Sequence, residues 1–123
     1  MRLILIACFT LIFSTSSFAT GNDFLPKCKV AVNVMDNGVE GAAYEDMINL
    51  TSCTSTIRGA RDMNSIYEQV NMPTLFCIPN SVQQGQLIRV AINYMESNPA
   101  ELHNPFVFLL GLAFNDAYPC SET

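Results

Sequence analysis

The stretch AYEDMINLTSCTSTIRGA, residues 43–60, decides the fold class of this chain. Its apolar side chains recur every three or four residues, the spacing of one face of an α-helix; they are Ala43, Met47, Leu50, Cys53, Ile57 and Ala60. Charged side chains such as Asp46 and Arg58 fall outside this stripe. The pattern predicts an amphipathic helix over residues 42–69, which stops before Pro73.

The segment before this helix carries two competing patterns. One has helical spacing, with Asn22 and Asp23 as N-caps and Pro26 in the first turn; its apolar members are Phe24, Cys28, Ala31 and Met35. The other is an alternation that enters a turn, as a strand does; it consists of Val30, Val32 and Val34 before Asp36-Asn37-Gly38. We favour the helix and keep the strand as the alternative.

Prolines at positions 73 and 79 bracket the next segment, which is expected to be extended because each proline disfavours helical geometry in the residue before it. Ser81 and Gln84 then have the form of a capping box, which predicts that a third helix starts there. This helix should end near Ser97-Asn98. Its expected buried face consists of Leu87, Ile88, Ala91, Tyr94 and Met95.

Residues 98–101, Asn-Pro-Ala-Glu, form a helix-start pattern of a cap, a first-turn proline and an acidic residue. We expect a fourth helix from here to Tyr118, bent or restarted at Pro105. From Phe106 onward this helix is apolar on nearly every side, which is typical of a buried helix. Three other helices cannot easily cover it in so small a chain, so we expect part of it to face a second copy in a homodimer.

The placement of four cysteines predicts two disulfides. Cys28 and Cys53 lie on the apolar stripes of the first two helices, whereas Cys77 precedes the third helix and Cys120 follows the fourth. Antiparallel packing within each helix pair would join Cys28 to Cys53 and Cys77 to Cys120. None of them forms a CxxC pair, so we expect no metal site. The sequence therefore predicts an all-α fold, a small bundle of four to five helices with two disulfides.

Residues 1–19 have the form of a secretory signal peptide. Arg2 precedes an apolar run over residues 3–13, and Ser17 and Ala19 are the small residues that a signal peptidase requires before its cut. The run is shorter than the about 20 apolar residues that span a bilayer, so no membrane insertion is expected. We predict a cleaved leader over residues 1–19 and a single domain over residues 20–123. A lipoprotein is the alternative, because residues 5–8 resemble its cleavage box.

Charge and motif content narrow the classes of function. The chain has 6 Lys and Arg against 11 Asp and Glu, a net charge of −5 that becomes −6 when Arg2 leaves with the leader. Nucleic acid is a poor partner for such an acidic surface. The sequence also lacks the motifs GxSxG, HExxH, GxxxxGK[ST] and DxDxDG, and His103 is its single histidine. We expect no catalytic residue and no cofactor, and therefore a binding protein rather than an enzyme.

The second half of the chain contains an ordered series of short matches: Phe76-Cys77-Ile78-Pro79, Gly85-Gln86-Leu87, Tyr94, the stretch NPAELH at residues 98–103, and Tyr118-Pro119-Cys120. This series resembles the Rap/Tai family of bacterial immunity proteins. The family also carries a Cys-x-Gly-Tyr-x-x-Gly-x-x-Asp segment, which is matched here at Cys53, Gly59 and Asp62. Ser55 and Thr56 stand in place of its first Gly and its Tyr.

The resemblance implies a periplasmic immunity protein that binds and inhibits a peptidoglycan amidase effector of a type VI secretion system. We expect contact through residues 97–104, the contact loop, held at its base by the Cys77–Cys120 bridge. The candidate partner-binding residues are Glu96, Asn98, Pro99, Glu101 and His103, for which helix capping is the competing role. The alternatives are an HdeA-like periplasmic stress or chaperone protein and a Rap/Tai-domain binding protein without a toxin partner.

Overall fold

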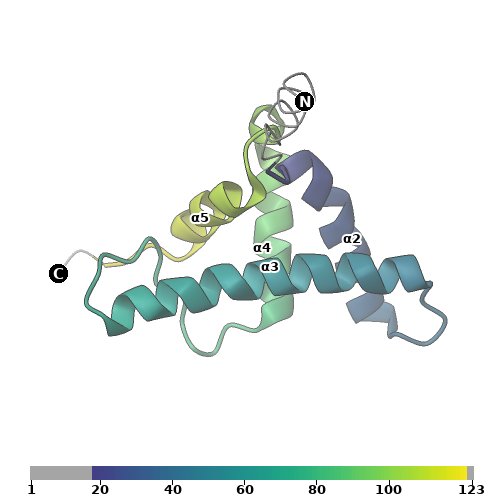
Figure 1. Cartoon of the computed structure of the whole chain (residues 1–123), viewed down its shortest axis with the longest axis horizontal. Helices are drawn as coiled ribbons and strands as arrows, with labels where there is room; N and C mark the ends of the chain where they lie inside the picture. Colours follow the sequence, from purple (N-terminus) through teal and green to yellow (C-terminus); the bar gives the residue numbers. More distant parts are fainter. Residues whose placement is uncertain (1–17, 122–123) are drawn as a thin grey trace, which may run out of the picture.

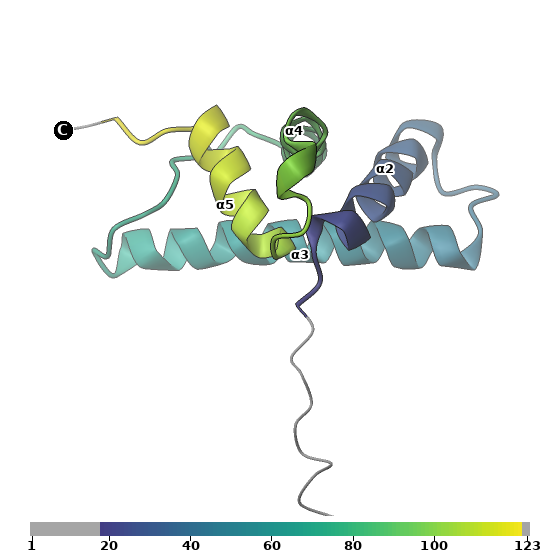
Figure 2. The ribbon, with the colours of Figure 1, turned by 90° about the horizontal axis from the view of Figure 1, so that it is seen from above.

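A computed structural model describes residues 18–121, so most of the predicted leader lies outside the described residues. Within that range the chain forms four α-helices and one 3-10 helix: α2 (Gly21–Asn37), α3 (Tyr44–Gln69), α4 (Gln84–Ser97), η2 (Pro99–Glu101) and α5 (Phe106–Ala117). The all-α fold is therefore confirmed. The long helix α3 lies across one side of a layer formed by α2, α4 and α5 (Figures 1 and 2).

Both predicted disulfides are confirmed. Cys28 and Cys53 join α2 to the middle of α3, and both side chains are completely buried. Cys77 and Cys120 join the segment before α4 to the segment after α5. The core between these bridges is built around two aromatic pairs, in which the rings of Phe24 and Phe106 stack and those of Phe76 and Phe114 meet edge to face.

The first segment is a helix, as favoured, and the alternative strand at residues 30–34 is wrong. Its start differs from the prediction, because Thr20 rather than Asn22 or Asp23 occupies the cap position. Pro26 consequently lies inside the helix and not in its first turn. Met35 is 43 % exposed whereas Val34 is buried, so the buried stripe of α2 ends one residue earlier than its spacing predicted.

Helix α3 buries a shorter stripe than its periodicity predicted. Its buried residues are Cys53 and Ile57, with Leu50 and Ala60 packed against the core at the margins. Ala43 is exposed at the cap position, and Met47 is half-buried. A helix of 26 residues is about 39 Å long, and the layer buries only residues near its middle, so the start of the stripe at Ala43 remains uncovered.

The predicted start of the third helix is wrong by two residues, because the cap is Gln83 and not Ser81. Helix α4 begins at Gln84 with Gln83 as its cap, and the capping box at Ser81 does not form. The Gln84 side chain instead donates a hydrogen bond from Nε2 to the Thr54 carbonyl of α3 at 3.0 Å. Leu87, Ile88, Ala91 and Met95 are buried as expected, whereas Tyr94 is only half-buried.

The fourth predicted helix is not continuous. Residues 99–101 form the short η2, and α5 begins at Phe106 after Pro105, so the restart at proline is correct and the start at Asn98 is wrong. The other helices do not cover α5 on all sides, as expected for so small a chain, because Val107 is 60 % and Phe108 is 54 % exposed. The layer covers one side of α5, along Phe106, Leu109, Leu110, Ala113 and Phe114.

Candidate partner-binding surface

The contact loop, residues 97–104, leads from α4 to α5 and is ordered by local hydrogen bonds. Asn98 Nδ2 donates to the Tyr94 carbonyl at 2.8 Å, and the Asn98 N–H donates to the same carbonyl at 3.0 Å, so Asn98 closes the end of α4 twice. His103 Nδ1 lies 3.0 Å from the Ala100 carbonyl oxygen. Asn98 therefore closes the end of α4, its side chain makes no cap bond at the start of the next helix, and Pro99 and His103 remain exposed.

The start of α2 holds the contact loop in place. The Gly21 N–H donates to the Asn104 carbonyl at 3.1 Å, and the Asn22 N–H donates to the Leu102 carbonyl at 2.9 Å. Gly21 is buried, and a Cβ atom there would lie 2.5 Å from Leu109 Cδ1 and 3.1 Å from the Leu102 oxygen. The absence of a side chain at Gly21 thus allows the two segments to approach this closely.

The Cys77–Cys120 bridge does not hold the contact loop, which corrects the sequence prediction. The bridge closes the far end of the α4–α5 pair, while the loop lies at the other end of α4. Helix α4 has 14 residues and is therefore about 21 Å long. The contact loop is held instead by the start of α2. This docking could not be predicted from the sequence, because the bonded residues of α2 and of the loop are some 80 positions apart in the chain.

The candidate acidic residues differ in their surroundings. Glu96 forms an ion pair with Lys29 of α2, in which both side chains are about half exposed. Glu101 lies in η2, and its charge adds to the larger effect of burial in raising the pKa of the Tyr94 phenol. The structure therefore groups Asn98, Pro99, Glu101 and His103 on one connection, and it directs Glu96 toward α2.

A polar groove lies next to the contact loop, between α4 and α5. Its volume is about 460 Å³, and it is lined by Val90, Asn93, Tyr94, Ser97, Asn98, Ala113, Asp116 and Ala117. Burial is the main cause of the raised pKa of Tyr94, with smaller contributions from the charges of Glu101 and Asp116. The phenol is thus a neutral hydrogen-bonding group in a negative field. Sequence analysis missed this groove because it assigned Tyr94 to the core and did not single out Asn93 or Asp116.

A family model described as Rap1a immunity proteins matches residues 20–120. The chain belongs to the Rap1a immunity protein family. The match spans both disulfides, the contact loop and the polar groove, so it confirms the resemblance stated from the sequence. Comparisons with curated proteins and with solved structures each found no match.

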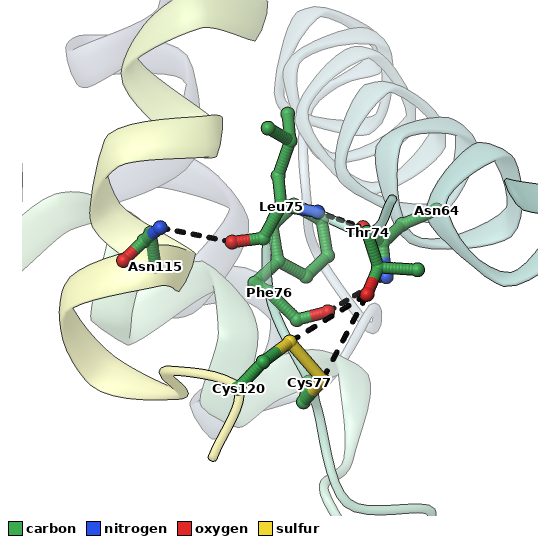
Figure 3. The surroundings of a disulfide bond; sticks show 7 residues. All are labelled: Asn64, Thr74, Leu75, Phe76, Cys77, Asn115 and Cys120. Atoms are coloured by element: carbon green, nitrogen blue, oxygen red, sulfur yellow. Dashed lines mark hydrogen bonds between the residues drawn. A yellow bond between two sulfur atoms is a disulfide. The ribbon is translucent and has the colours of Figure 1, made fainter. Parts of the chain in front are cut away.

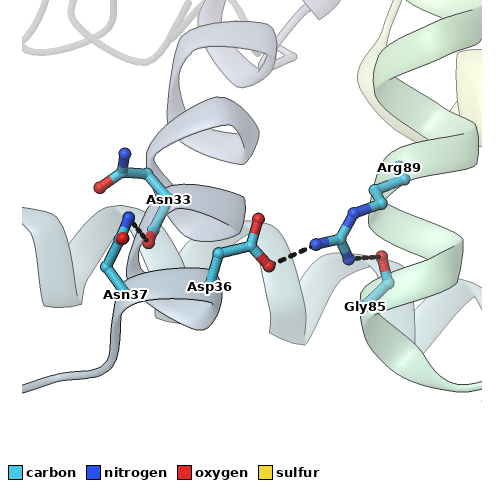
Figure 4. Close-up of polar contacts among 5 residues, drawn as sticks. All are labelled: Asn33, Asp36, Asn37, Gly85 and Arg89. Atoms are coloured by element: carbon cyan, nitrogen blue, oxygen red, sulfur yellow. Dashed lines mark hydrogen bonds and ion pairs between the residues drawn. The ribbon is translucent and has the colours of Figure 1, made fainter.

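A second groove in this Rap1a-family chain lies between the end of α2 and the middle of α3. It has a volume of about 530 Å³ and is lined by Met35, Leu50, Thr51, Thr54, Ser55, Arg58, Gly59 and Asp62. Ser55, Gly59 and Asp62 are three positions of the family's helical segment, so the departure at Ser55 lies on the surface and not in the core. Asp36 nearby forms an ion pair with Arg89, which ties the end of α2 to α4 (Figure 4).

The Rap1a-family chain also has an apolar face, which we define by Met63, Tyr67, Leu75, Val107 and Phe108. These side chains line two adjoining hollows between the second half of α3, residue 75 and α5. Leu75 is 63 % exposed although its backbone is held on both sides. Its N–H donates to Asn64 Oδ1 at 3.1 Å, and its carbonyl accepts from Asn115 Nδ2 at 2.9 Å (Figure 3).

Neither a metal-binding cluster nor a membrane-spanning helix occurs among residues 18–121. No group of three or more His, Cys, Asp or Glu side chains that could hold a metal ion occurs in this part of the chain. None of its helices combines the length and the apolarity needed to cross a membrane. The surfaces that remain as candidates are the contact loop with its polar groove, the second groove and the apolar face.

Proposed function

We propose that this Rap1a-family chain is a periplasmic immunity protein that binds and inhibits a peptidoglycan amidase effector of a type VI secretion system. The observation that carries the proposal is the family match over residues 20–120. The leader-like residues 1–19 and two disulfides support export of a domain spanning residues 20–123 into an oxidising compartment. The protein acts by binding and performs no catalysis of its own.

Inhibition takes place through the contact loop, which covers the active-site groove of the amidase. A loop that is already ordered loses little conformational entropy on binding, and this one is held by Gly21, Asn22 and Asn98. Glu101 and Asp116 make the neighbouring polar groove suited to basic side chains of the amidase. Glu96 contributes less, because binding a partner would require it to leave Lys29.

We further propose that the protein is a homodimer that pairs through the apolar face. Its five large side chains are between 36 % and 63 % exposed, so together they offer on the order of 500 Å², a large part of the roughly 800 Å² that each partner contributes to a standard interface. Sedimentation at several concentrations tests this. Phe108→Glu should yield monomers with an unchanged circular dichroism spectrum, and a wild-type chain that is monomeric throughout would contradict the dimer.

The immunity function is tested by protection of bacteria. A candidate amidase effector is directed to the periplasm of a host cell, and survival is measured with and without the Rap1a-family chain. Glu101→Lys should abolish protection. Glu40→Lys makes the same change of charge after the end of α2, far from the start of α2 that holds the contact loop, and should leave protection intact. Full protection by a double Glu101→Lys, His103→Ala variant would exclude the contact loop.

A periplasmic chaperone is the second candidate, favoured by the exposed apolar face. A chaperone of the HdeA type would expose more apolar surface on acidification. Binding of a hydrophobic dye, measured between pH 7 and pH 3, separates the two functions. An immunity protein should bind no additional dye until it unfolds.

A further inference from the structure

The peptide bond between Ala19 and Thr20, where the leader is expected to be cut, is part of the folded domain. The Ala19 carbonyl accepts a hydrogen bond from the Phe106 N–H at 2.9 Å. The Thr20 N–H donates to Asp23 Oδ2 at 2.8 Å, and Thr20 pairs with Pro105 in an antiparallel bridge. Both hydrogen-bonding groups of this peptide are therefore occupied in the fold.

Gly21 and Asn22, which follow this bond, are also held by hydrogen bonds to the fold. Gly21 and Asn22 donate their N–H groups to the carbonyls of Asn104 and Leu102, and Gly21 has no room for a side chain. A peptidase must draw the chain on both sides of the bond into an extended form and bind the same backbone groups itself. In the folded protein it can do so only after the first turn of α2 has opened. The rate of cleavage is therefore proportional to the fraction of molecules in the open state.

We propose that the leader is cut only while α2 is undocked from residues 102–106, so that cleavage precedes folding, and that Asp23 then holds the new amino terminus. In the cleavage, water adds to the Ala19 carbonyl carbon and the C–N bond breaks. Ala19 leaves with the leader as a carboxylate, and Thr20 keeps its nitrogen as an ammonium group. The proposal rests on the export assumed in the proposed function.

The geometry around Thr20 suits an ammonium group. A positive charge at a helix N-terminus is unfavourable by itself, because the positive end of the helix dipole lies there. Asp23 offsets this charge, since its Oδ2 atom lies 2.8 Å from the Thr20 nitrogen and also accepts from Thr20 Oγ1 at 2.9 Å. The Phe106 N–H loses this partner on cleavage, and as a first-turn N–H of α5 it has no partner within that helix.

Cleavage of the full precursor, residues 1–123, by purified signal peptidase in detergent micelles tests the order of events. The oxidised, folded precursor is compared with the same chain reduced and unfolded in urea, with both diluted to identical conditions. The folded precursor should be cut at least about tenfold more slowly, because cleavage waits for local opening. Equal rates would overturn the proposal, and so would failure of the unfolded chain to be cut after Ala19.

Two glycine variants provide a matched comparison. Gly21→Ala forces a side chain against Leu109 and should bring cleavage of the folded precursor close to the unfolded rate. Gly59→Ala, which meets no atom within 4 Å, should leave the folded precursor resistant. All the unfolded precursors should be cut alike. Resistance of a folded Gly21→Ala precursor equal to that of wild type would refute the role of this docking.

The second part of the proposal has its own measurement, which does not depend on any variant of the precursor. The pKa of the Thr20 amine is determined by nuclear magnetic resonance in a chain that starts at Thr20 and in its Asp23→Asn variant. The pKa should be higher with Asp23 present, and equal values would overturn the ion pair. Protection in cells is assayed with the same chain exported by an unrelated leader, so a failure of the immunity function is distinguished from a failure of this proposal.

Discussion

Removing each disulfide in turn separates chain entropy from core packing. The bridges close loops with sequence separations of 25 and 43 residues. In the chain-entropy description these contribute about 3.5 kcal/mol for Cys28–Cys53 and about 4 kcal/mol for Cys77–Cys120. Loop length alone therefore predicts that loss of the Cys77–Cys120 bridge lowers the free energy of unfolding slightly more.

Burial of the Cys28–Cys53 bridge reverses the order of the two stability losses. Cys28 and Cys53 are both 0 % exposed within the core cluster, whereas Cys77 is exposed and Cys120 is half-buried. Replacing the buried pair with alanine leaves a cavity of about 40 Å³, which at about 24 cal/mol per Å³ adds about 1 kcal/mol, and lost contacts add a similar amount. We expect a total loss of roughly 5.5 kcal/mol for Cys28→Ala, Cys53→Ala against roughly 4 kcal/mol for Cys77→Ala, Cys120→Ala.

Guanidinium unfolding of the two double variants at pH 7 measures this difference, with the wild-type chain as reference. A second measurement uses the exposure directly: at a low concentration of a thiol reductant, the Cys77–Cys120 bridge should be reduced first because Cys77 is accessible. A larger loss of stability in the Cys77→Ala, Cys120→Ala variant, or earlier reduction of the buried bridge, would refute the reasoning.

Three further predictions concern single residues. Asn64→Ala should lower the free energy of unfolding by about 2 kcal/mol and Asn115→Ala by about 1 kcal/mol, because Asn64 bonds to both Leu75 N–H and Phe76 O whereas Asn115 bonds to Leu75 O alone; urea unfolding checks the ratio, and equal losses would contradict it. Gly59→Ala should raise the stability by about 0.5–1 kcal/mol, since its Cβ would meet nothing within 4 Å; a lower melting temperature would show that the glycine is needed for the fold. Asp23→Asn should lower the melting temperature at pH 7, because hydrogen bonds from the Thr20 N–H and hydroxyl hold the pKa of Asp23 below its ordinary 3.8. This stabilisation is complete above pH 3.8 and is lost as the pH falls through the lowered pKa; a difference from wild type that persists unchanged in stronger acid would refute the role of the charge.

The points at which helices begin were the least predictable part of the fold. Ser81 and Asn98 each open a valid capping pattern, yet α4 begins at Gln84 and α5 at Phe106. At α4 a distant partner favours the later start, since Gln84 bonds to the Thr54 carbonyl, whereas α5 begins directly after Pro105, which occupies its cap position. A local pattern is worth about 1 kcal/mol, which a few such tertiary contacts exceed.

The candidate site was only partly predictable, because some of its contacts join residues that are distant in the chain. The contact loop followed from the sequence, because Asn98 and Pro99 end one helix wherever the rest of the chain lies. Its support by α2 and the polar groove beside it did not follow, because Gly21 meets residues 102–109 only through folding. Tyr94 has the spacing of a core residue, yet it is only half-buried and lines the groove between α4 and α5.

The sequence by itself determined the helical class, the family and the pairing of the cysteines. Periodicity shows which face of a helix is apolar, and two such faces that each carry a cysteine can pack in few ways. Only the tertiary structure decided how much of each face is covered: Cys53 and Ile57 in the middle of α3 are buried, while Val107 and Phe108 on α5 are exposed. Burial depends on neighbours that are distant in the chain, and no local pattern records how far a covering layer extends.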